Sequence, residues 1–181
     1  SKAILTAAEK CKMPKGIFAQ VYGAGFEVGI TLVTHPHTKA VGFTGSFSGG
    51  KQLFDWGNQR KVPIPVFAEM GSVNPVFLLP EKMKSSVSDI AKMYAASITL
   101  GVGQFCTKPG IIVAVDNDDL KIFRSLLTEE IKISMPAPML HAGIYKNYVE
   151  KKATALSQAE VEQVAVSDVD AALNQGSACI A

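Results

Sequence analysis

Two segments of the sequence carry side chains that suit a base and a nucleophile. Glu69 supplies a carboxylate in the segment VFAEMGSVNPVFLLP, and Cys106 supplies a thiol in the segment TLGVGQFCTKPG. Glycines stand near both side chains, at Gly71, Gly101, Gly103 and Gly110. Since glycine lets the main chain approach a ligand closely, both segments suit a site at which a thiol attacks and a carboxylate moves protons.

The remaining cysteines and the histidines give little indication of a metal or redox site. Cys11 is expected on the apolar phase of a helix, and Cys179 lies in a run of small residues, so both are expected to behave as small buried hydrophobes. No CxxC pair is present, and His35 and His37 flank a proline in a turn where we expect them to face solvent. The sequence therefore predicts no metal site.

Composition limits the class of protein. The chain has 181 residues, 48% of them hydrophobic, which is enough for a substantial core. Its formal net charge of +2 is spread along the chain without a basic run, so nucleic acid is not an expected partner. No apolar run approaches the roughly 20 residues that cross a bilayer. We expect a cytoplasmic α/β protein without a membrane partner.

The first seventy residues alternate between helical and strand-like patterns, as in a parallel sheet with crossover helices. This part predicts about half of a doubly wound nucleotide-binding sheet. The expected elements are a helix over 2–11, a strand over 17–22, a helix that Gly23, Gly25 and Gly29 open and whose buried face is Val28, Leu32 and Val33, a short run over 39–43, a helix from about Phe47 towards Arg60, and a strand over 66–70.

The remaining residues predict a second set of helices around one more buried strand. Apolar residues between Val87 and Ile98 keep a 3.6-residue period, so a helix is expected to lead to the glycines before Cys106. The other expected elements are a strand over 111–115, a helix capped within 116–118 that buries Leu120, Phe123, Leu127 and Ile131, a helix over 144–156, and a helix over 168–173.

Three motifs, taken in order, resemble the signature set of the aldehyde dehydrogenase superfamily. The motifs are Phe43-Thr44-Gly45-Ser46 with Gly50, Glu69-Met70-Gly71-Ser72 with Asn74-Pro75, and Gly103-Gln104-Phe105-Cys106. Each motif alone is weak, but three in this order are specific. The wording most resembles the branch that oxidises 2-oxoglutarate semialdehyde (2,5-dioxopentanoate), with fatty-aldehyde enzymes close by.

The resemblance implies a fold and a division into domains. It covers the middle of the family's length, so we expect an α/β, parallel-sheet, Rossmann-like core that is incomplete at both ends relative to the family. Residues 1–70 would be the C-terminal part of the dinucleotide-binding domain, and residues 71–181 the N-terminal part of the catalytic domain. The resemblance also implies a homo-oligomer, either a dimer or a tetramer, for the full-length enzyme.

The resemblance assigns residues to NAD or NADP. Gly45 and Ser46, at the start of a helix, would offer N–H groups and the positive end of the helix dipole to the pyrophosphate. The full set of expected cofactor-binding residues is Gly25, Gly29, Phe43, Thr44, Gly45, Ser46, Met70 and Gly71.

The resemblance also assigns the chemistry. Cys106 would add to the aldehyde as a thiolate, and the thiohemiacetal would become a thioester after loss of hydride. Glu69 would then activate the hydrolytic water. Two of the family's parts, an oxyanion-binding Asn in a Pro-Trp-Asn segment and a ribose-binding Glu, lie outside the matched region, so the isolated chain is expected to be inactive or severely impaired.

Other functions remain open at this point. The chain is alternatively a catalytically silent core that folds and associates through unpaired sheet edges. It is alternatively a fatty-aldehyde or succinate-semialdehyde dehydrogenase. A third alternative, acyl transfer from Cys106 to coenzyme A, has less need of a water-activating base, so Glu69 disfavours it.

Overall fold

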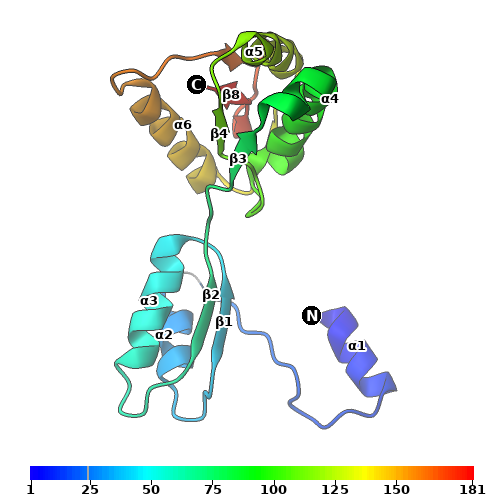
Figure 1. Cartoon of the computed structure of the whole chain (residues 1–181). Coiled ribbons are helices and arrows are strands. Elements are labelled where there is room, and N and C mark those ends of the chain that lie inside the picture. The colour runs from blue at the N-terminus through cyan, green and yellow to red at the C-terminus, as the bar shows by residue number, and fades with distance from the viewer. Residues whose placement is uncertain (24) are drawn as a thin grey trace. The chain divides into compact units, whose positions relative to one another are not determined.

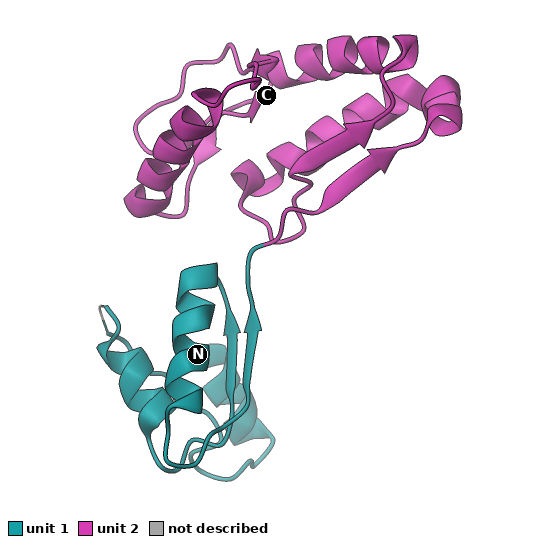
Figure 2. Ribbon diagram, turned by 60° about the vertical axis from the view of Figure 1, so that its left-hand side comes forward, with its two compact units in different colours: residues 1–71 teal, residues 72–181 magenta. Residues whose placement is uncertain are grey.

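The protein forms two compact units, and each contains a two-stranded parallel sheet with helices packed against it. The computed structural model describes residues 1–23 and 25–181, which divide into unit 1, residues 1–71, and unit 2, residues 72–181 (Figure 2). Both parallel pairs are joined through a helix. The α/β, parallel-sheet prediction is confirmed.

Unit 1 contains a β-α-β segment preceded by two helices. Its elements are α1 (Lys2–Lys10), α2 (Glu27–Thr34), β1 (Val41–Thr44), α3 (Phe47–Asn58) and β2 (Val66–Glu69). Strands β1 and β2 pair in parallel, with Val41 opposite Val66 and Thr44 opposite Glu69 (Figure 1). Helix α3 connects the two strands and packs against both of them and against α2.

Close backbone approach holds α3 to the sheet. Gly50 and Gly57 are the buried residues of this helix. A Cβ at Gly57 would lie 2.6 Å from Cγ2 of Val66, and a Cβ at Gly50 would lie 2.7 Å from Cγ of Met70. Larger residues at these two positions would push the helix away from β2, so the glycines set the distance between the layers.

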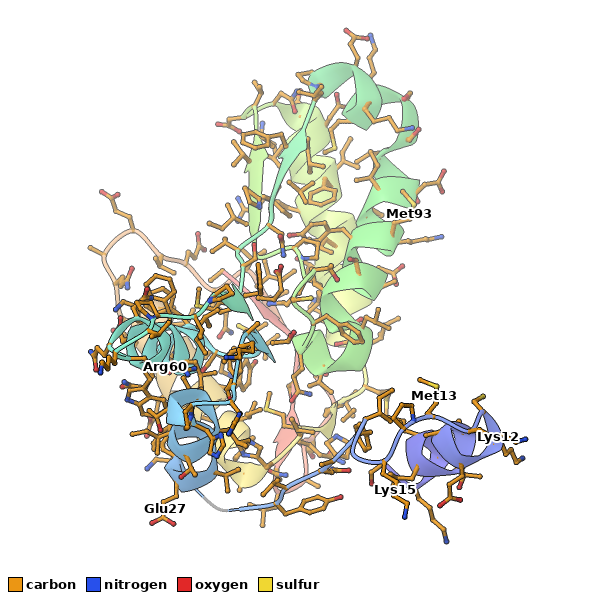
Figure 3. All side chains as sticks on the ribbon, turned by 90° about the horizontal axis from the view of Figure 1, so that it is seen from below. Lys12, Met13, Lys15, Glu27, Arg60 and Met93 are labelled. Carbon is orange, nitrogen blue, oxygen red and sulfur yellow. The ribbon has the colours of Figure 1, made fainter. Side chains whose placement is uncertain are left out.

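Arg60 fastens the end of α2. The guanidinium of Arg60, which is labelled in Figure 3, donates hydrogen bonds to the carbonyls of Val33 at 3.0 Å, Thr38 at 2.9 Å and His35 at 3.0 Å. The C-terminal carbonyls of a helix lack partners within the helix. Arg60 bonds one such carbonyl, that of Val33, and also the carbonyls of the C-cap His35 and of Thr38 in the turn that follows. His35 and His37 are exposed, as predicted.

Unit 2 is larger and contains three small sheets. Strands β3 and β4 pair in parallel, with Pro75 opposite Ile111, while β5 pairs with β7 and β6 with β8 in antiparallel fashion. The elements are β3 (Pro75–Leu78), α4 (Pro80–Thr99), the 3-10 helix η1 (Leu100–Gly103), β4 (Ile111–Ala114), α5 (Asp118–Lys132), β5 (Ala137–Pro138), α6 (Ala142–Leu156), β6 (Ala165–Val166), β7 (Gln175–Gly176) and β8 (Cys179–Ile180).

The core of unit 2 lies between α4, α5 and one face of the β3–β4 pair. Phe123, Leu127 and Ile131 of α5 are buried, which confirms three of the four predicted positions, and Leu120 is partly buried. The predicted cap of α5 is confirmed, because the Asn117 side chain accepts a hydrogen bond from the Leu120 N–H at 2.9 Å. The other buried members of this core are Leu78, Met83, Ile90, Ala91, Ala95 and Ala165.

Two predicted elements are wrong. Residues 17–22 form no strand, because no described strand pairs with them, and Tyr22 in this stretch is 77% exposed. Residues 168–173 form no helix, because their N–H groups bond outside it: that of Asp168 to the Lys132 carbonyl, and that of Ala172 to the Gln175 side chain. Leu173, which would have been its apolar anchor, is 92% exposed.

Two predictions about burial are also wrong. Cys11 is exposed, because α1 buries none of its residues. Leu32 is 50% exposed, whereas Val33 beside it is buried and Val28 is half-buried. Helix α2 therefore buries a narrower face than its apolar composition predicts.

Candidate active site

Glu69 lies at the carboxyl end of the β1–β2 pair. Thr44 is its partner across the sheet, and both side chains are exposed. The Gly45 N–H donates to the Glu69 carbonyl at 3.0 Å, which extends the pairing by one residue. The residues after both strands therefore lie at one sheet edge, which is where ligands bind in open α/β sheets.

The helix that begins at this edge offers an anion site. Ser46 is the N-cap of α3, and its hydroxyl accepts a hydrogen bond from the Gly49 N–H at 3.2 Å. The first turn carries no acidic side chain, and within the described residues the N–H groups of Phe47 and Ser48 have no acceptor. Free amides and the helix dipole favour a phosphate group here.

Phe43 shapes the turn from inside. A Cβ at Gly45 would lie 2.6 Å from Cζ of Phe43, and a Cβ at Gly49 would lie 3.0 Å from the same atom. The ring therefore lies against the backbone at the start of α3, and the two glycines make room for it. The Phe43 side chain is half-buried and packs against these glycines. Its contribution to the site is therefore to shape the backbone at the start of α3.

The other predicted cofactor residues divide into two groups. Met70 packs on α3, where its Sδ would lie 2.8 Å from a Cβ at Gly50, and Gly71 is exposed with open space around it. Gly25 has a φ of +73°, and Gly29 on α2 faces Trp56 of α3. Thr44, Gly45, Ser46, Glu69 and Met70 are thus brought to one edge, whereas no described interaction links Gly25 or Gly29 to that edge.

Cys106 lies in a β-turn in unit 2. The Lys108 N–H donates to the Phe105 carbonyl at 3.1 Å, so Cys106 is the second residue of the turn, and its side chain is exposed. Within the described residues the Cys106 N–H has no acceptor. An exposed thiol beside a free main-chain donor is suited to attack a carbonyl group and to hold the resulting oxyanion.

The chain reaches this turn through a left-handed segment. Gly101, Val102 and Gly103 have φ values of +55°, +58° and +68°. A β-branched residue rarely adopts this conformation, and strained backbone of this kind costs about 1–3 kcal/mol. Helix α4 therefore stops at Thr99, and the left-handed segment separates it from the Cys106 turn.

Asn74 holds the Cys106 turn from the side of β3. Its Nδ2 donates to the carbonyl of Cys106 at 2.7 Å and to that of Lys108 at 3.1 Å. Its Oδ1 accepts from the Ser72 hydroxyl at 2.8 Å. The sequence places Asn74 in a recognisable motif, but only the fold shows that its side chain reaches a turn more than 30 residues away.

Gln104, directly before the turn, connects the end of η1 to the segment after β5. Its Nε2 donates to the Gly101 carbonyl at 3.0 Å, and its Oε1 accepts from the Leu140 N–H at 3.0 Å. A cavity of about 730 Å³ borders this region, and its lining includes Gln104, Lys108 and Tyr148 but not Cys106. The Lys108 side chain lies over Gly103, where its Cδ would be 3.1 Å from a Cβ, so it is packed rather than free in solvent.

The described residues provide neither a metal cluster nor a membrane-spanning helix. The part of the chain that the structure describes contains no cluster of three or more His, Cys, Asp or Glu residues that would hold a metal ion. None of the helices in residues 1–23 and 25–181 is long and apolar enough to span a bilayer.

Comparison with known proteins gives a consistent family. The model of the aldehyde dehydrogenase family matches residues 1–138. The chain is 44% identical over 147 residues to alpha-ketoglutaric semialdehyde dehydrogenase 2 of Azospirillum brasilense, which covers 81% of the chain and 28% of that protein. It is 38% identical over 181 residues to alpha-ketoglutaric semialdehyde dehydrogenase of Acinetobacter baylyi, with 99% of the chain and 30% of that protein covered. The chain thus spans less than a third of the length of these relatives.

Solved structures support the fold. A crystal structure of a proline utilization A mutant from Bradyrhizobium japonicum matches with a TM-score of 0.81 at 15% identity, over 97% of the chain and 18% of that protein. A NAD-dependent benzaldehyde dehydrogenase from Corynebacterium glutamicum matches with a TM-score of 0.77 at 20% identity, over 94% of the chain and 38% of that protein. At these identities the likeness concerns the fold.

Proposed function

The chain belongs to the aldehyde dehydrogenase family, and we propose that it serves the NAD(P)+-dependent oxidation of an aldehyde to a carboxylate. The observation that carries the proposal is the exposed thiol of Cys106 in a held β-turn, next to its own unbonded N–H. The two relatives described above are named for alpha-ketoglutaric semialdehyde, so we propose 2-oxoglutarate semialdehyde as the substrate. Unit 1 would then serve the cofactor, and unit 2 would carry the nucleophile.

Cys106 would act first. Its thiolate sulfur forms a bond to the aldehyde carbon, and the carbonyl oxygen becomes an oxyanion that the Cys106 N–H can stabilise. The sequence contains no Pro-Trp-Asn segment, whose Asn is the family's second oxyanion donor. Since loss of one such donor costs on the order of 10²–10³ in rate, we expect slow turnover by this chain alone.

Unit 1 has residues that fit a dinucleotide. The free N–H groups of Phe47 and Ser48, the absence of acid from the first turn of α3, and the exposure of Gly45 all suit a pyrophosphate. When bound, NAD+ or NADP+ supplies the hydride acceptor that turns the Cys106 adduct into a thioester.

Glu69 would act last. Its exposed carboxylate can take a proton from water, so that the water oxygen attacks the thioester carbon and the Cys106 sulfur leaves as thiolate. The products of this step are the carboxylic acid and the free enzyme. The three steps together consume one aldehyde and one water and deliver one hydride to the cofactor.

A single-turnover experiment tests both roles. The chain is mixed with 2-oxoglutarate semialdehyde and either NAD+ or NADP+, quenched, digested and searched by mass spectrometry for acylated cysteine. We expect the acyl group on Cys106, more of it in Glu69→Gln because hydrolysis slows by about 10²–10⁴, and none in Cys106→Ala. Exposed Cys11 is the control in the same sample.

Two outcomes would contradict the proposal. Equal acylation of Cys106 and Cys11 would remove the nucleophile assignment, and unchanged thioester decay in Glu69→Gln would remove the base. Reaction without dinucleotide should leave no thioester, since no hydride acceptor is then present.

Self-association is a further part of the proposal. Phe77 and Ile111 are 66% and 50% exposed on neighbouring strands of unit 2, which is a large apolar exposure for a sheet face. Sedimentation velocity would detect the proposed homo-oligomer, and a purely monomeric chain across concentrations would contradict it.

A further inference from the structure

We propose that Asn74 is a positioning residue for Cys106. This proposal rests on the proposed role of Cys106 as nucleophile. Asn74 precedes β3 and uses all the hydrogen-bonding groups of its amide on its neighbours. The two N–H bonds of Nδ2 are directed to the carbonyls of Cys106 and Lys108, and Oδ1 accepts from the hydroxyl of Ser72. One side chain therefore fixes two peptide planes of the turn and is itself fixed by a third group.

The two bonds act on the backbone next to the thiol. The carbonyl of Cys106 belongs to the peptide that joins it to Thr107, so its orientation is set by ψ of Cys106. Holding that carbonyl at 2.7 Å limits ψ and thereby limits how the Cα–Cβ bond is directed relative to the turn. The second bond, to Lys108 at 3.1 Å, holds the far end of the turn.

A backbone bond supports the same contact. The Gly110 N–H donates to the Val73 carbonyl at 2.7 Å, directly before β3 and β4 begin to pair. A Cβ at Gly110 would lie 2.7 Å from that carbonyl oxygen, so only glycine allows the approach. The segment before β3 thus lies along the turn before β4, and the amide of Asn74 is held within reach.

Asparagine meets two demands at this position. Its φ is +48°, a left-handed conformation that Asn and Asp adopt far more readily than most side chains. Two carbonyl acceptors need two donors, which an amide has and a carboxylate lacks. Asp at this position would keep the volume and the backbone preference, but it would place negative charge against two carbonyl oxygens.

The consequence for reactivity depends on the reaction. Acylation of a thiolate passes through a tetrahedral oxyanion, so it gains from a thiol and an N–H donor held in a fixed relation. Alkylation by iodoacetamide is a displacement that develops no oxyanion. The ratio of the two rates at one cysteine therefore reports positioning, and changes in access or thiolate fraction affect both rates together.

The experiment measures this ratio in the 181-residue chain. Acylation by 4-nitrophenyl acetate and alkylation by iodoacetamide are followed at Cys106 by peptide mass spectrometry, with exposed Cys11 in unit 1 as the internal reference. In wild type we expect the ratio at Cys106 to exceed that at Cys11. Asn74→Asp should lower the ratio at Cys106 by about tenfold or more, which is less than the roughly 10²–10³ that loss of an oxyanion donor costs, because the Cys106 N–H itself remains. Its alkylation rate should change much less than its acylation rate.

Two further variants separate positioning from folding. Asn74→Gly keeps the left-handed backbone without the amide, and Ser72→Ala removes only the hydroxyl that orients the amide. We expect the ratio of acylation to alkylation at Cys106 to fall least in Ser72→Ala, more in Asn74→Gly and most in Asn74→Asp. Circular dichroism should be unchanged in all three variants. If Asn74→Asp fails to fold, Ser72→Ala carries the test, and a ratio equal to wild type in a folded Ser72→Ala then overturns the proposal.

The outcomes distinguish this proposal from the one on which it rests. A wild-type ratio at Cys106 no higher than at Cys11 overturns both the nucleophile and its positioning residue. A raised wild-type ratio that persists in folded Asn74→Asp overturns the positioning role alone and leaves Cys106 as the nucleophile.

Discussion

Unit 1 and unit 2 differ in the interactions that stabilise each of them internally. The buried apolar side chains that the structure describes in unit 1 are Val33 and Ile64. Unit 2 instead buries a continuous cluster in which Phe123 and Ile131 are almost fully enclosed. In unit 1, glycines allow α3 to pack closely on the sheet, and the hydrogen bonds of Arg60 hold the end of α2. Unit 2 relies instead on apolar packing.

This difference matters for the proposed chemistry. The proposed nucleophile lies in the unit with the larger core. Side chains connect its turn, and the residue before the turn, to the segments that flank β3 and β5. The proposed base ends a two-stranded sheet whose other contacts are fewer. We therefore expect the Cys106 turn to keep its geometry under conditions that already loosen the edge at Glu69.

The largest expected effect comes from opening the core of unit 2. Phe123 is 1% exposed, and Phe123→Ala should lower the free energy of unfolding of unit 2 by about 3–5 kcal/mol through lost burial and a residual cavity. Amide hydrogen exchange in α4 and α5 during a urea series measures it. Ile122→Ala is the matched control on the same helix, since Ile122 is 49% exposed.

The chain carries its own probe for the comparison. Its one tryptophan, Trp56, lies on α3 in unit 1. The Trp56 fluorescence transition should therefore stay where it is in Phe123→Ala. A shift of that transition together with the exchange of α5 would mean that the units unfold as one.

The long helices show what the sequence could predict. The spacing of Phe123, Leu127 and Ile131 predicted both α5 and its buried face, because apolar residues with a 3.6-residue period lie on one face only in a helix. The strand expected over 17–22 failed for the opposite reason. A strand exists only with a partner, and the presence of a partner is a property of the fold rather than of the local residues.

The second effect concerns unit 1. Gly57→Ala would place a Cβ 2.6 Å from the stiff Val66 side chain, so overpacking of about 1–3 kcal/mol should outweigh a gain in helix propensity of about 1 kcal/mol. We expect the free energy of unfolding that Trp56 reports to fall by up to about 2 kcal/mol, so that its transition moves to lower urea, with exchange in α5 unchanged.

A matched glycine gives the opposite sign. At Gly29 on α2 a Cβ would have only ordinary contact, 3.9 Å from the Trp56 ring. Gly29→Ala should therefore stabilise unit 1 by up to about 1 kcal/mol. If both variants shift the transition in the same direction, glycine packing is not what sets the stability of unit 1.

The candidate site was predictable only in part. Glu69 and Cys106 could be named because their motifs are local, and the cap at Ser46 follows from its hydroxyl before a helix. Asn74 also lies in a motif, but its contact with the Cys106 carbonyl depends on how β3 and β4 pair. The strain at Val102 has no sequence signal, since a β-branched residue argues against a left-handed turn.

The smallest expected effect tests whether α6 and the main core of unit 2 have the same local stability. Tyr148 of α6 lies beside the cavity rather than in the main core, and its hydroxyl donates to the Ser177 carbonyl. Burial, and secondarily the charge of Cys179, raise the pKa of Tyr148 from 10.0 to about 12. The neutral form is thus favoured on folding. Its contribution to stability is full below pH 10.0 and is lost as the pH rises through about 12.

Tyrosinate absorbance during an alkaline titration measures this group. We expect a late phase near pH 12 that Tyr148→Phe removes and that Tyr22→Phe, at a 77% exposed position in unit 1, leaves in place. At neutral pH, Tyr148→Phe should cost about 0.5–1.5 kcal/mol, the usual value of one hydrogen bond. Because α6 lies outside the main core, this loss should increase hydrogen exchange in α6 before it does so in α5. Equal increases in both helices would show that the flank and the core of unit 2 open together.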